Sequence, residues 1–382
     1  MTWNVSQERA FFPEDSLASY NPDALGLAIS GGGYRATLFH AGALIRMNEL
    51  KFLPRIDRIS SVSGGSITAG ILAMGWKHFD FDDDGRVTAA SFQKHFIDPI
   101  LAATARTIDV GVTVAGYMPF VSAGNVLARN YDKHIFKGMM LSDLPERPAF
   151  VFNATNLQTG GLFRFTRNYA ADWRALTSTV KTIRVADAVA ASSAFPPVLA
   201  PVRLDLSGEE VSTPDRARYN DPRLHKKPVL VDAGVYDNLG LESVWKRCGA
   251  IICSYAGHNA KPNTGNFNLG HMVTVVNTFL AGSIDWRERT LISLFTSKLS
   301  DGLPERRGAY WSAGSTLENY PVHDGWKPDA QTIEAAKLTS TRLKGLSRDA
   351  QKQIIYAGYG FADAGLRSYL PDGGTPPEGP PL

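Results

Sequence analysis

The segment ISSVSGGS at residues 59–66 sets the architecture expected of this chain, because it puts a serine at a sharp bend between a strand and a helix. Residues 52–59 have the apolar and β-branched character of a strand, and residues 67–74 form an apolar run that predicts a helix. Glycines directly after Ser63 let the backbone turn tightly and hold the hydroxyl in the open, as in a nucleophile elbow. On its own, the segment also fits a Gly/Ser-rich turn in an ordinary α/β loop.

A similar strand, bend and helix come earlier in the chain. Residues 25–30 predict a short buried strand, and residues 36–50 have the apolar spacing of a helix. Strands that alternate with helices predict an α/β fold with a mainly parallel sheet covered on both faces. The bend holds Gly31, Gly32 and Gly33, whose backbone N–H groups could bind a phosphate or a developing oxyanion. The segment lacks the endings of a P-loop and of a dinucleotide fingerprint, so we expect neither nucleotide site.

An aspartate provides the candidate base. Asp232 follows a buried-type strand at residues 228–231, and the small residues after it would let its carboxylate reach a neighbouring loop. A serine becomes strongly nucleophilic only beside a base. His40 lies on the helix after the glycines, where we expect a packed, hydrogen-bonded core histidine. The sequence therefore predicts a Ser63–Asp232 dyad in which the carboxylate takes the proton directly.

The composition is that of a soluble globular protein, with 382 residues, 44% hydrophobic and 20% charged residues and a net charge of +3. No basic run with interleaved aromatics appears, which argues against a nucleic-acid partner. Cys248 and Cys253 have neither a disulfide nor a metal spacing, so we expect buried free thiols in a reducing compartment. Because we find neither a signal-peptide pattern nor a membrane-spanning apolar stretch, we expect a cytoplasmic protein.

We expect one large domain at residues 25–370, after a polar leader at residues 1–24. Its catalytic core is expected at about residues 25–260, and its helical C-terminal portion at about residues 261–370. The Pro/Gly-rich residues 371–382 predict a disordered tail.

The remaining segments of the chain lead to further predictions. The broken apolar segment 111–128 predicts either a buried capping segment or a mobile lid that touches lipid. The acidic turn at residues 79–86 lacks the last glutamate of a calcium loop, so we expect no metal there. Late helices are predicted at residues 285–299, 329–345 and 347–369.

Taken together, these motifs resemble the patatin-like phospholipase family and the related catalytic domain of cytosolic phospholipase A2. The resemblance covers roughly residues 25 to 240. Each motif is common, but the joint order is specific. The matching segments are SGGGYRA at 30–36, SVSGG at 61–65, ATNLQTG at 154–160, ASSAFPP at 191–197, DAG at 232–234 and DNLG at 237–240.

The resemblance implies a three-layer α/β/α fold and a role for each matched residue. It implies Ser63 as the nucleophile, Asp232 as the base, and the backbone of Gly31, Gly32 and Gly33 as the oxyanion hole. Arg35 and Gly64 are implied at the substrate site, where Arg35 would brace the glycine loop or meet a lipid phosphate. The chain departs from the family pattern at Ser61, Ala36 and Ala233, and because all three are small residues we expect the site still to form.

The activity implied by the resemblance is that of a lipid acyl hydrolase of the phospholipase A or lysophospholipase type. It would cleave a phospholipid or another acyl ester through an acyl-enzyme, without a metal or organic cofactor, during transient contact with a membrane surface. A homo-oligomer or a small-molecule activator is compatible with it. Two alternatives stay open: a ligand-gated or catalytically weak lipid-binding protein, and a soluble short-chain esterase or thioesterase.

Overall fold

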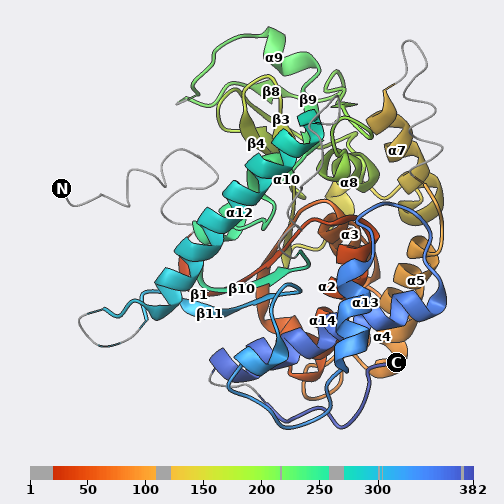
Figure 1. Ribbon diagram of the computed structural model, residues 1–382. Coiled ribbons are helices and arrows are strands. Elements are labelled where there is room, and N and C mark those ends of the chain that lie inside the picture. Colours follow the sequence, from red (N-terminus) through yellow and green to blue (C-terminus); the bar gives the residue numbers. More distant parts are fainter. Residues whose placement is uncertain are drawn as a thin grey trace.

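A mixed sheet of 11 strands forms the centre of the protein (Figure 1). The computed structural model describes residues 20–108, 122–215, 217–257, 271–299, 302, 304–370 and 374–382. Neighbouring strands are parallel from one edge to the middle of the sheet. In spatial order these are β11 (Arg307–Ser312), β10 (Cys248–Tyr255), β1 (Asn21–Ile29), β2 (Ile56–Ser61) and β3 (Ala149–Asn156).

Beyond β3 the sheet continues with short antiparallel strands. One antiparallel strand, β9 (Val229–Asp232), pairs with β3 and brings Asp232 opposite Ala154. The other antiparallel strands are β4 (Gly161–Phe165), β5 (Ala170–Asp172), β6 (Leu176–Ser178), β7 (Val202–Arg203) and β8 (Val211–Ser212).

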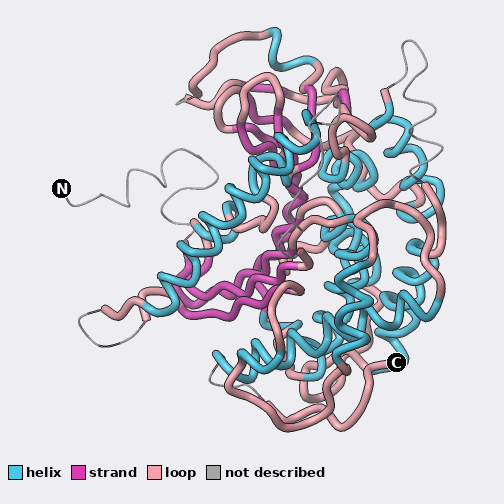
Figure 2. Tube along the Cα trace, viewed as in Figure 1, coloured by secondary structure: helices cyan, strands magenta, loops and turns pink. Residues whose placement is uncertain are grey.

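Helices cover both faces of the sheet, which confirms the predicted three-layer α/β/α fold (Figures 1 and 2). On β1, Leu27 and Ile29 belong to the larger apolar core, whereas Ala28 between them belongs to a second core on the opposite face. The larger core includes α2 (Gly33–Glu49), α3 (Gly64–Trp76), α5 (Asp98–Thr104), α8 (Val185–Ser193) and α14 (Arg348–Tyr369). The second core includes α11 (Glu242–Trp245) and α12 (His271–Thr296).

Helices α2 and α14 cross with their backbones in contact. A Cβ atom added at Gly42 would lie 2.0 Å from the carbonyl oxygen of Ile355, and one at Gly358 would lie 1.9 Å from that of Phe39. Glycine is therefore required at both crossing positions. The helical C-terminal portion is thus packed directly on the helix that follows the glycine loop.

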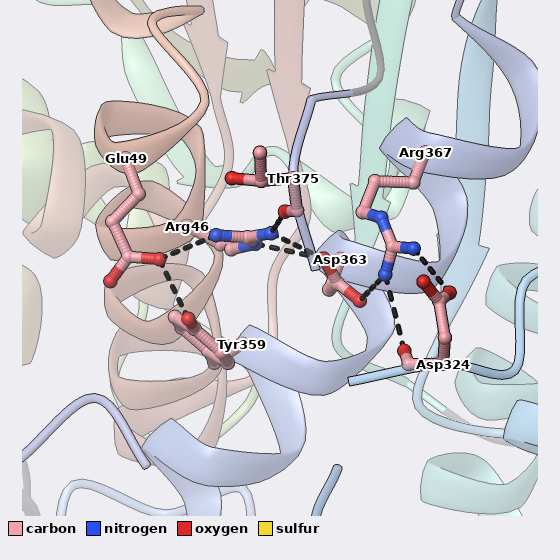
Figure 3. Close-up of polar contacts among 7 residues, drawn as sticks. All are labelled: Arg46, Glu49, Asp324, Tyr359, Asp363, Arg367 and Thr375. Atoms are coloured by element: carbon pink, nitrogen blue, oxygen red, sulfur yellow. Dashed lines mark hydrogen bonds and ion pairs between the residues drawn. The ribbon is translucent and has the colours of Figure 1, made fainter. Parts of the chain in front are cut away.

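A buried network of charges joins the same two helices (Figure 3). Arg46 on α2 donates one hydrogen bond to Asp363 on α14 at 2.8 Å and another to Glu49 at 2.7 Å. Asp363 also accepts from Arg367 at 3.2 Å, and Glu49 accepts from the hydroxyl of Tyr359 at 2.6 Å. Every buried charge in the network has a partner of opposite sign, as burial requires.

Several predicted boundaries are wrong. Strand β1 begins at Asn21, inside the segment expected to be a polar leader. In the segment predicted as a disordered tail, the carbonyl oxygens of Pro377 and Leu382 accept hydrogen bonds from Trp326 and Tyr356 at 2.8 Å each. Its apolar and backbone groups pack on the domain, which composition alone does not reveal.

The late helices also differ from the prediction. Helix α12 begins earlier than expected, α13 (Ala330–Leu338) ends earlier, and α14 is close to its predicted bounds. Residues 109–121, most of the predicted capping segment or lid, lie outside the described residues.

Candidate active site

The bend between β2 and α3 holds Ser63 in a backbone conformation that non-glycine residues rarely adopt. Its φ is 50° and its ψ is −118°, directly before the first turn of α3. The two glycines that follow have no room for a side chain. A Cβ atom added at Gly64 would lie 2.0 Å from the carbonyl oxygen of Gly33, and one added at Gly65 would lie 2.6 Å from the carbonyl oxygen of Ser30. The local sequence therefore forms the predicted elbow.

The carboxylate of Asp232 lies beside the hydroxyl at this bend. The Ser63 side chain lies close enough to the Asp232 carboxylate to lower its pKa, and the backbone N–H of Gly234 donates a hydrogen bond to it at 2.7 Å. Both side chains are buried, with 8% of Ser63 and 4% of Asp232 exposed. Burial raises the pKa of Asp232 to about 6, against the opposing effects of the Gly234 N–H and the Ser63 side chain. The structure thus brings together the two residues predicted as a dyad.

Ser192, at the end of α8, connects the elbow with the strand that carries the aspartate. Its hydroxyl accepts from the backbone N–H of Ser63 at 3.0 Å and lies 2.8 Å from the hydroxyl of Ser66. Its carbonyl oxygen accepts from the N–H of Ala233 at 3.2 Å. Sequence reasoning assigned Ser192 no role, although the segment ASSAFPP that contains it was a signal.

Ser61 takes part in the same network. The Ser66 hydroxyl donates to the hydroxyl of Ser61 at 2.9 Å, and the Ser61 hydroxyl donates to the carbonyl oxygen of Val151 at 3.2 Å. The serine that replaces the usual glycine of the elbow therefore ties β2 to its neighbour β3.

Tyr131, at the end of α7 (Ala123–Tyr131), is a second residue near the dyad that the sequence did not indicate. It is fully buried, and its hydroxyl lies 3.1 Å from that of Ser193. Burial raises the pKa of Tyr131, and the nearby negative charge of Asp232 adds to the effect. The phenol therefore remains neutral beside the carboxylate.

The glycine loop lies against the elbow. A Cβ atom at Gly31 would lie 3.0 Å from the Cβ of Ser63 and 2.4 Å from the side-chain oxygen of Asn238. The N–H of Gly31 donates to the carbonyl oxygen of Asn238 at 3.1 Å, so it supports the loop rather than a ligand. Gly32 and Gly33 have positive φ values of 136° and 56°. Within the described parts of the chain, no protein group accepts from the N–H of either residue.

A C-terminal segment, residues 337–342, covers the glycine loop, and we call it the strap. Arg35 donates from Nη1 to the carbonyl oxygens of Lys337 at 2.9 Å and Thr339 at 3.2 Å. The N–H of Tyr34 donates to the carbonyl oxygen of Arg342 at 3.3 Å. The strap approaches Gly33 so closely that a Cβ atom there would lie 1.8 Å from the carbonyl oxygen of Thr341. Arg35, only 7% exposed, therefore braces the loop through backbone contacts.

The remaining candidates lie apart from the dyad. His40 is fully buried, and its ring nitrogens lie 2.9 Å from the Ser254 hydroxyl and 3.0 Å from the Ser30 carbonyl oxygen. Burial lowers its pKa to about 4, so it is a neutral core histidine, as expected. In the acidic turn, Arg86 pairs with Asp82 at 3.1 Å and with Asp84 at 3.2 Å.

Neither a metal-binding cluster nor a membrane-spanning helix is found within the described residues. No cluster of three or more His, Cys, Asp or Glu side chains there could hold a metal ion. None of the helices in that part of the protein combines the length and apolarity needed to cross a bilayer. Cys248 and Cys253 are both buried and free, as predicted.

Comparison with known proteins links this arrangement to a family. The family model described as "Patatin-like phospholipase" matches residues 27–245, which include the glycine loop, the elbow and Asp232. No curated protein matches the chain by sequence. The structure of human GIVD cytosolic phospholipase A2 aligns with 94% of this chain at a TM-score of 0.50 and 11% identity, which shows a shared fold. This chain spans 60% of that protein.

Two other solved structures are less similar. Human GIVD cytosolic phospholipase A2 in complex with methyl gamma-linolenyl fluorophosphonate has a TM-score of 0.48 and 14% identity, over 89% of this chain and 56% of its own. VipD from Legionella pneumophila has a TM-score of 0.35 and 15% identity, over 90% of this chain and 68% of its own.

Proposed function

Because the chain belongs to the patatin-like phospholipase family, we propose that it hydrolyses carboxylic esters of lipids through a Ser63–Asp232 dyad. The observation that carries this proposal is the position of the Ser63 side chain, which lies at a bend with φ of 50° and close enough to the buried carboxylate of Asp232 to lower its pKa. A hydroxyl held in an uncommon backbone conformation beside a base is the arrangement that nucleophilic catalysis needs.

In the proposed reaction, Ser63 attacks the acyl carbonyl carbon while its proton passes to Asp232. The negative charge that develops on the carbonyl oxygen is stabilised by backbone N–H groups that have no protein partner. Gly32 and Gly33 supply such groups, and the start of α3 at Gly64 lies beside them. The N–H of Gly31 already donates to the carbonyl oxygen of Asn238, so the role of Gly31 is to leave the room that a side chain would fill.

The tetrahedral intermediate then expels the alcohol, which takes the proton from Asp232, and leaves an acyl group on Ser63. In the second half, water attacks the acyl-enzyme while Asp232 accepts the proton of the water. The serine recovers its proton when the fatty acid leaves. The pKa of Asp232, about 6, suits this double use, because the carboxylate is ionised at neutral pH and still basic enough to accept a proton.

The proposed substrate is a phospholipid or another lipid ester at a membrane surface on the cytoplasmic side. Helix α12 supports contact with such a surface, since Phe279 is 75% exposed, Trp286 71% and Val275 42%. The opposite side of α12 carries the buried residues Ile284 and Leu291, and Arg287 on its flank pairs with Asp237 at 3.3 Å. Exposed aromatic side chains of this kind are favoured at the lipid–water interface.

The proposal is tested by labelling the purified protein with a fluorophosphonate and by assaying phospholipid vesicles beside short-chain nitrophenyl esters. We expect label on Ser63, none on the Ser63→Ala variant, and faster turnover of vesicles than of the short esters. An unlabelled wild-type protein that still binds lipid would indicate a binding protein. Preference for the short esters would indicate a soluble esterase or thioesterase.

A further inference from the structure

A groove of about 460 Å³ lies at the far end of the helix that begins at the elbow. Helix α3 starts at Gly64, and its C-terminal residues Met74 and Gly75 line the groove. Because α3 has 13 residues, the groove lies about 20 Å along the helix from Ser63. Its volume is within the range of small-molecule sites. The groove is therefore separate from the candidate active site.

Cationic side chains dominate this groove. Lys77, Lys94 and Lys137 line it, together with one acidic residue, Asp143, whose carboxylate accepts from the backbone N–H of Met140 at 3.0 Å. All three lysines are exposed, and within the described residues none of them forms a salt bridge. Three lysines from three separate segments thus line one hollow, in which Asp143 is the one acidic lining residue and Asp132 binds the lining residue Gly138 from beside it.

Two histidines add hydrogen-bonding groups to the same groove. The rings of His78 and His95 are stacked, with centroids 5.3 Å apart and an interplanar angle of 24°. The segments that carry them are in direct contact, since a Cβ atom at Gly75 would lie 2.5 Å from the carbonyl oxygen of His95. The spacing of the two rings is therefore fixed by backbone packing.

The groove also has apolar lining. Met74, Phe136, Met139 and Pro99 line it alongside the charged residues. Phe136 is buried, and its ring packs against α3 so tightly that a Cβ atom at Gly70 would lie 2.7 Å from it. Methionine side chains adapt readily to a bound apolar group. The groove thus offers positive charge and imidazole N–H groups beside a flexible apolar surface.

We propose that this groove binds a phosphate-bearing anion, with Lys77, Lys94 and Lys137 holding the phosphate oxygens and the methionines contacting the attached apolar or ring portion. Charge-assisted bonds from several ammonium groups suit a phosphate monoester, which presents three oxygens and up to two negative charges. The phosphate can come from a lipid headgroup or from a free phosphorylated molecule, and the chemistry of the groove is the same for both.

The test measures binding by the Ser63→Ala variant, so that no substrate is consumed. The probes are inositol hexakisphosphate in solution and phosphatidylcholine vesicles with and without phosphatidic acid. The groove variant carries Lys77→Gln, Lys94→Gln and Lys137→Gln. A matched control carries Lys226→Gln, Lys227→Gln and Lys327→Gln, which remove the same charge at exposed positions elsewhere.

We expect the groove variant to bind at least about tenfold more weakly than its parent, whereas the control retains its affinity. The loss should recur in the double variant Lys77→Glu, Lys94→Glu, which leaves the left-handed backbone position of Lys137 unchanged. A loss with inositol hexakisphosphate identifies a free phosphate as a ligand, and a loss with phosphatidic acid vesicles alone identifies a lipid headgroup.

Equal losses in the groove and control variants, or no binding of either probe by the parent, would overturn the proposal. Because the measurement is binding by a protein without the proposed nucleophile, these outcomes leave the proposed hydrolysis untouched.

Discussion

Ser63 follows strand β2 and Asp232 ends strand β9, two strands that both pair with β3, and the Ser63 side chain lies close enough to Asp232 to lower the pKa of its carboxyl. Strand β2 ends in the bend that presents the hydroxyl, and β9 runs antiparallel to β3 and ends in the carboxylate. Ser192 bridges the two ends, because its hydroxyl accepts from Ser63 and its carbonyl oxygen accepts from Ala233.

The first prediction concerns the dyad itself. Ser63→Ala and Asp232→Asn should each lower kcat for ester hydrolysis by about a thousandfold or more, because the acyl-enzyme route needs both groups. Circular dichroism checks that both variants fold. Activity close to that of the wild type in either folded variant would contradict the assignment. Ser91→Ala, which removes a buried hydroxyl far from the dyad in sequence, serves as the control.

The second prediction is the pH dependence of catalysis. Because Asp232 must be ionised to accept a proton and its pKa is about 6, kcat/KM should fall as the pH drops through about 6 and level off above about 7. His40 should not add a second inflection to the pH–rate profile in this range, since burial lowers its pKa to about 4. A pH–rate profile on an uncharged ester measures this. A flat profile between pH 5 and 8 would count against Asp232 as the base.

The third prediction concerns stability. Folding raises the pKa of Asp232 from 3.8 to about 6, so the folded state holds the proton more tightly than the unfolded state does. The buried charge therefore costs stability as the pH rises from about 4 through 6, and the cost is on the order of 3 kcal/mol above that range. Asp232→Asn should raise the Tm at pH 7.5, and the gain should disappear near pH 4. An unchanged difference across this range would refute the link to ionisation.

The fourth prediction separates two roles for Arg35. If it positions the glycine loop through the strap, Arg35→Lys should lower kcat by about ten- to a hundredfold for phospholipid and nitrophenyl esters alike, with little change in KM. A lysine keeps the charge, but its ammonium ends one bond short of the position of Nη1 and lacks the planar guanidinium that fixes the direction of the two bonds. A rise in KM for phospholipid alone would instead indicate contact with the lipid phosphate. Arg203→Lys, at an exposed position, is the matched control.

The fifth prediction concerns the buried charges between α2 and α14 (Figure 3). Asp363→Ala removes the shared partner of Arg46 and Arg367, whose side chains are 3% and 7% exposed. The free energy of unfolding should fall by about 1.5 to 3 kcal/mol, because both buried cations lose a charge-assisted hydrogen bond, while Arg46 keeps Glu49 and Arg367 keeps Asp324 as partners. Urea unfolding measures the change. Asp84→Ala, which breaks exposed ion pairs, should have little effect, and equal effects of the two changes would contradict the argument.

Much of the candidate site could be predicted because it depends on short-range steric rules. The glycines after Ser63 and those at Gly32 and Gly33 are required by positive φ values or by backbone contacts, so their residue types carry the signal directly. A carboxylate at the end of a buried strand can be recognised from the sequence just as directly. These features determined the elbow, the glycine loop and the choice of Asp232.

The tertiary structure decided what surrounds them. The strap meets Gly33, Tyr34 and Arg35 through backbone carbonyl oxygens, and every residue type supplies one, so no pattern marks residues 337–342. Ser192 and Tyr131 reach the dyad only because α8 and α7 pack against it. The sequence alone determined which groups do the proposed chemistry. Long-range packing, which leaves little trace in local residue types, decided which groups hold them in place.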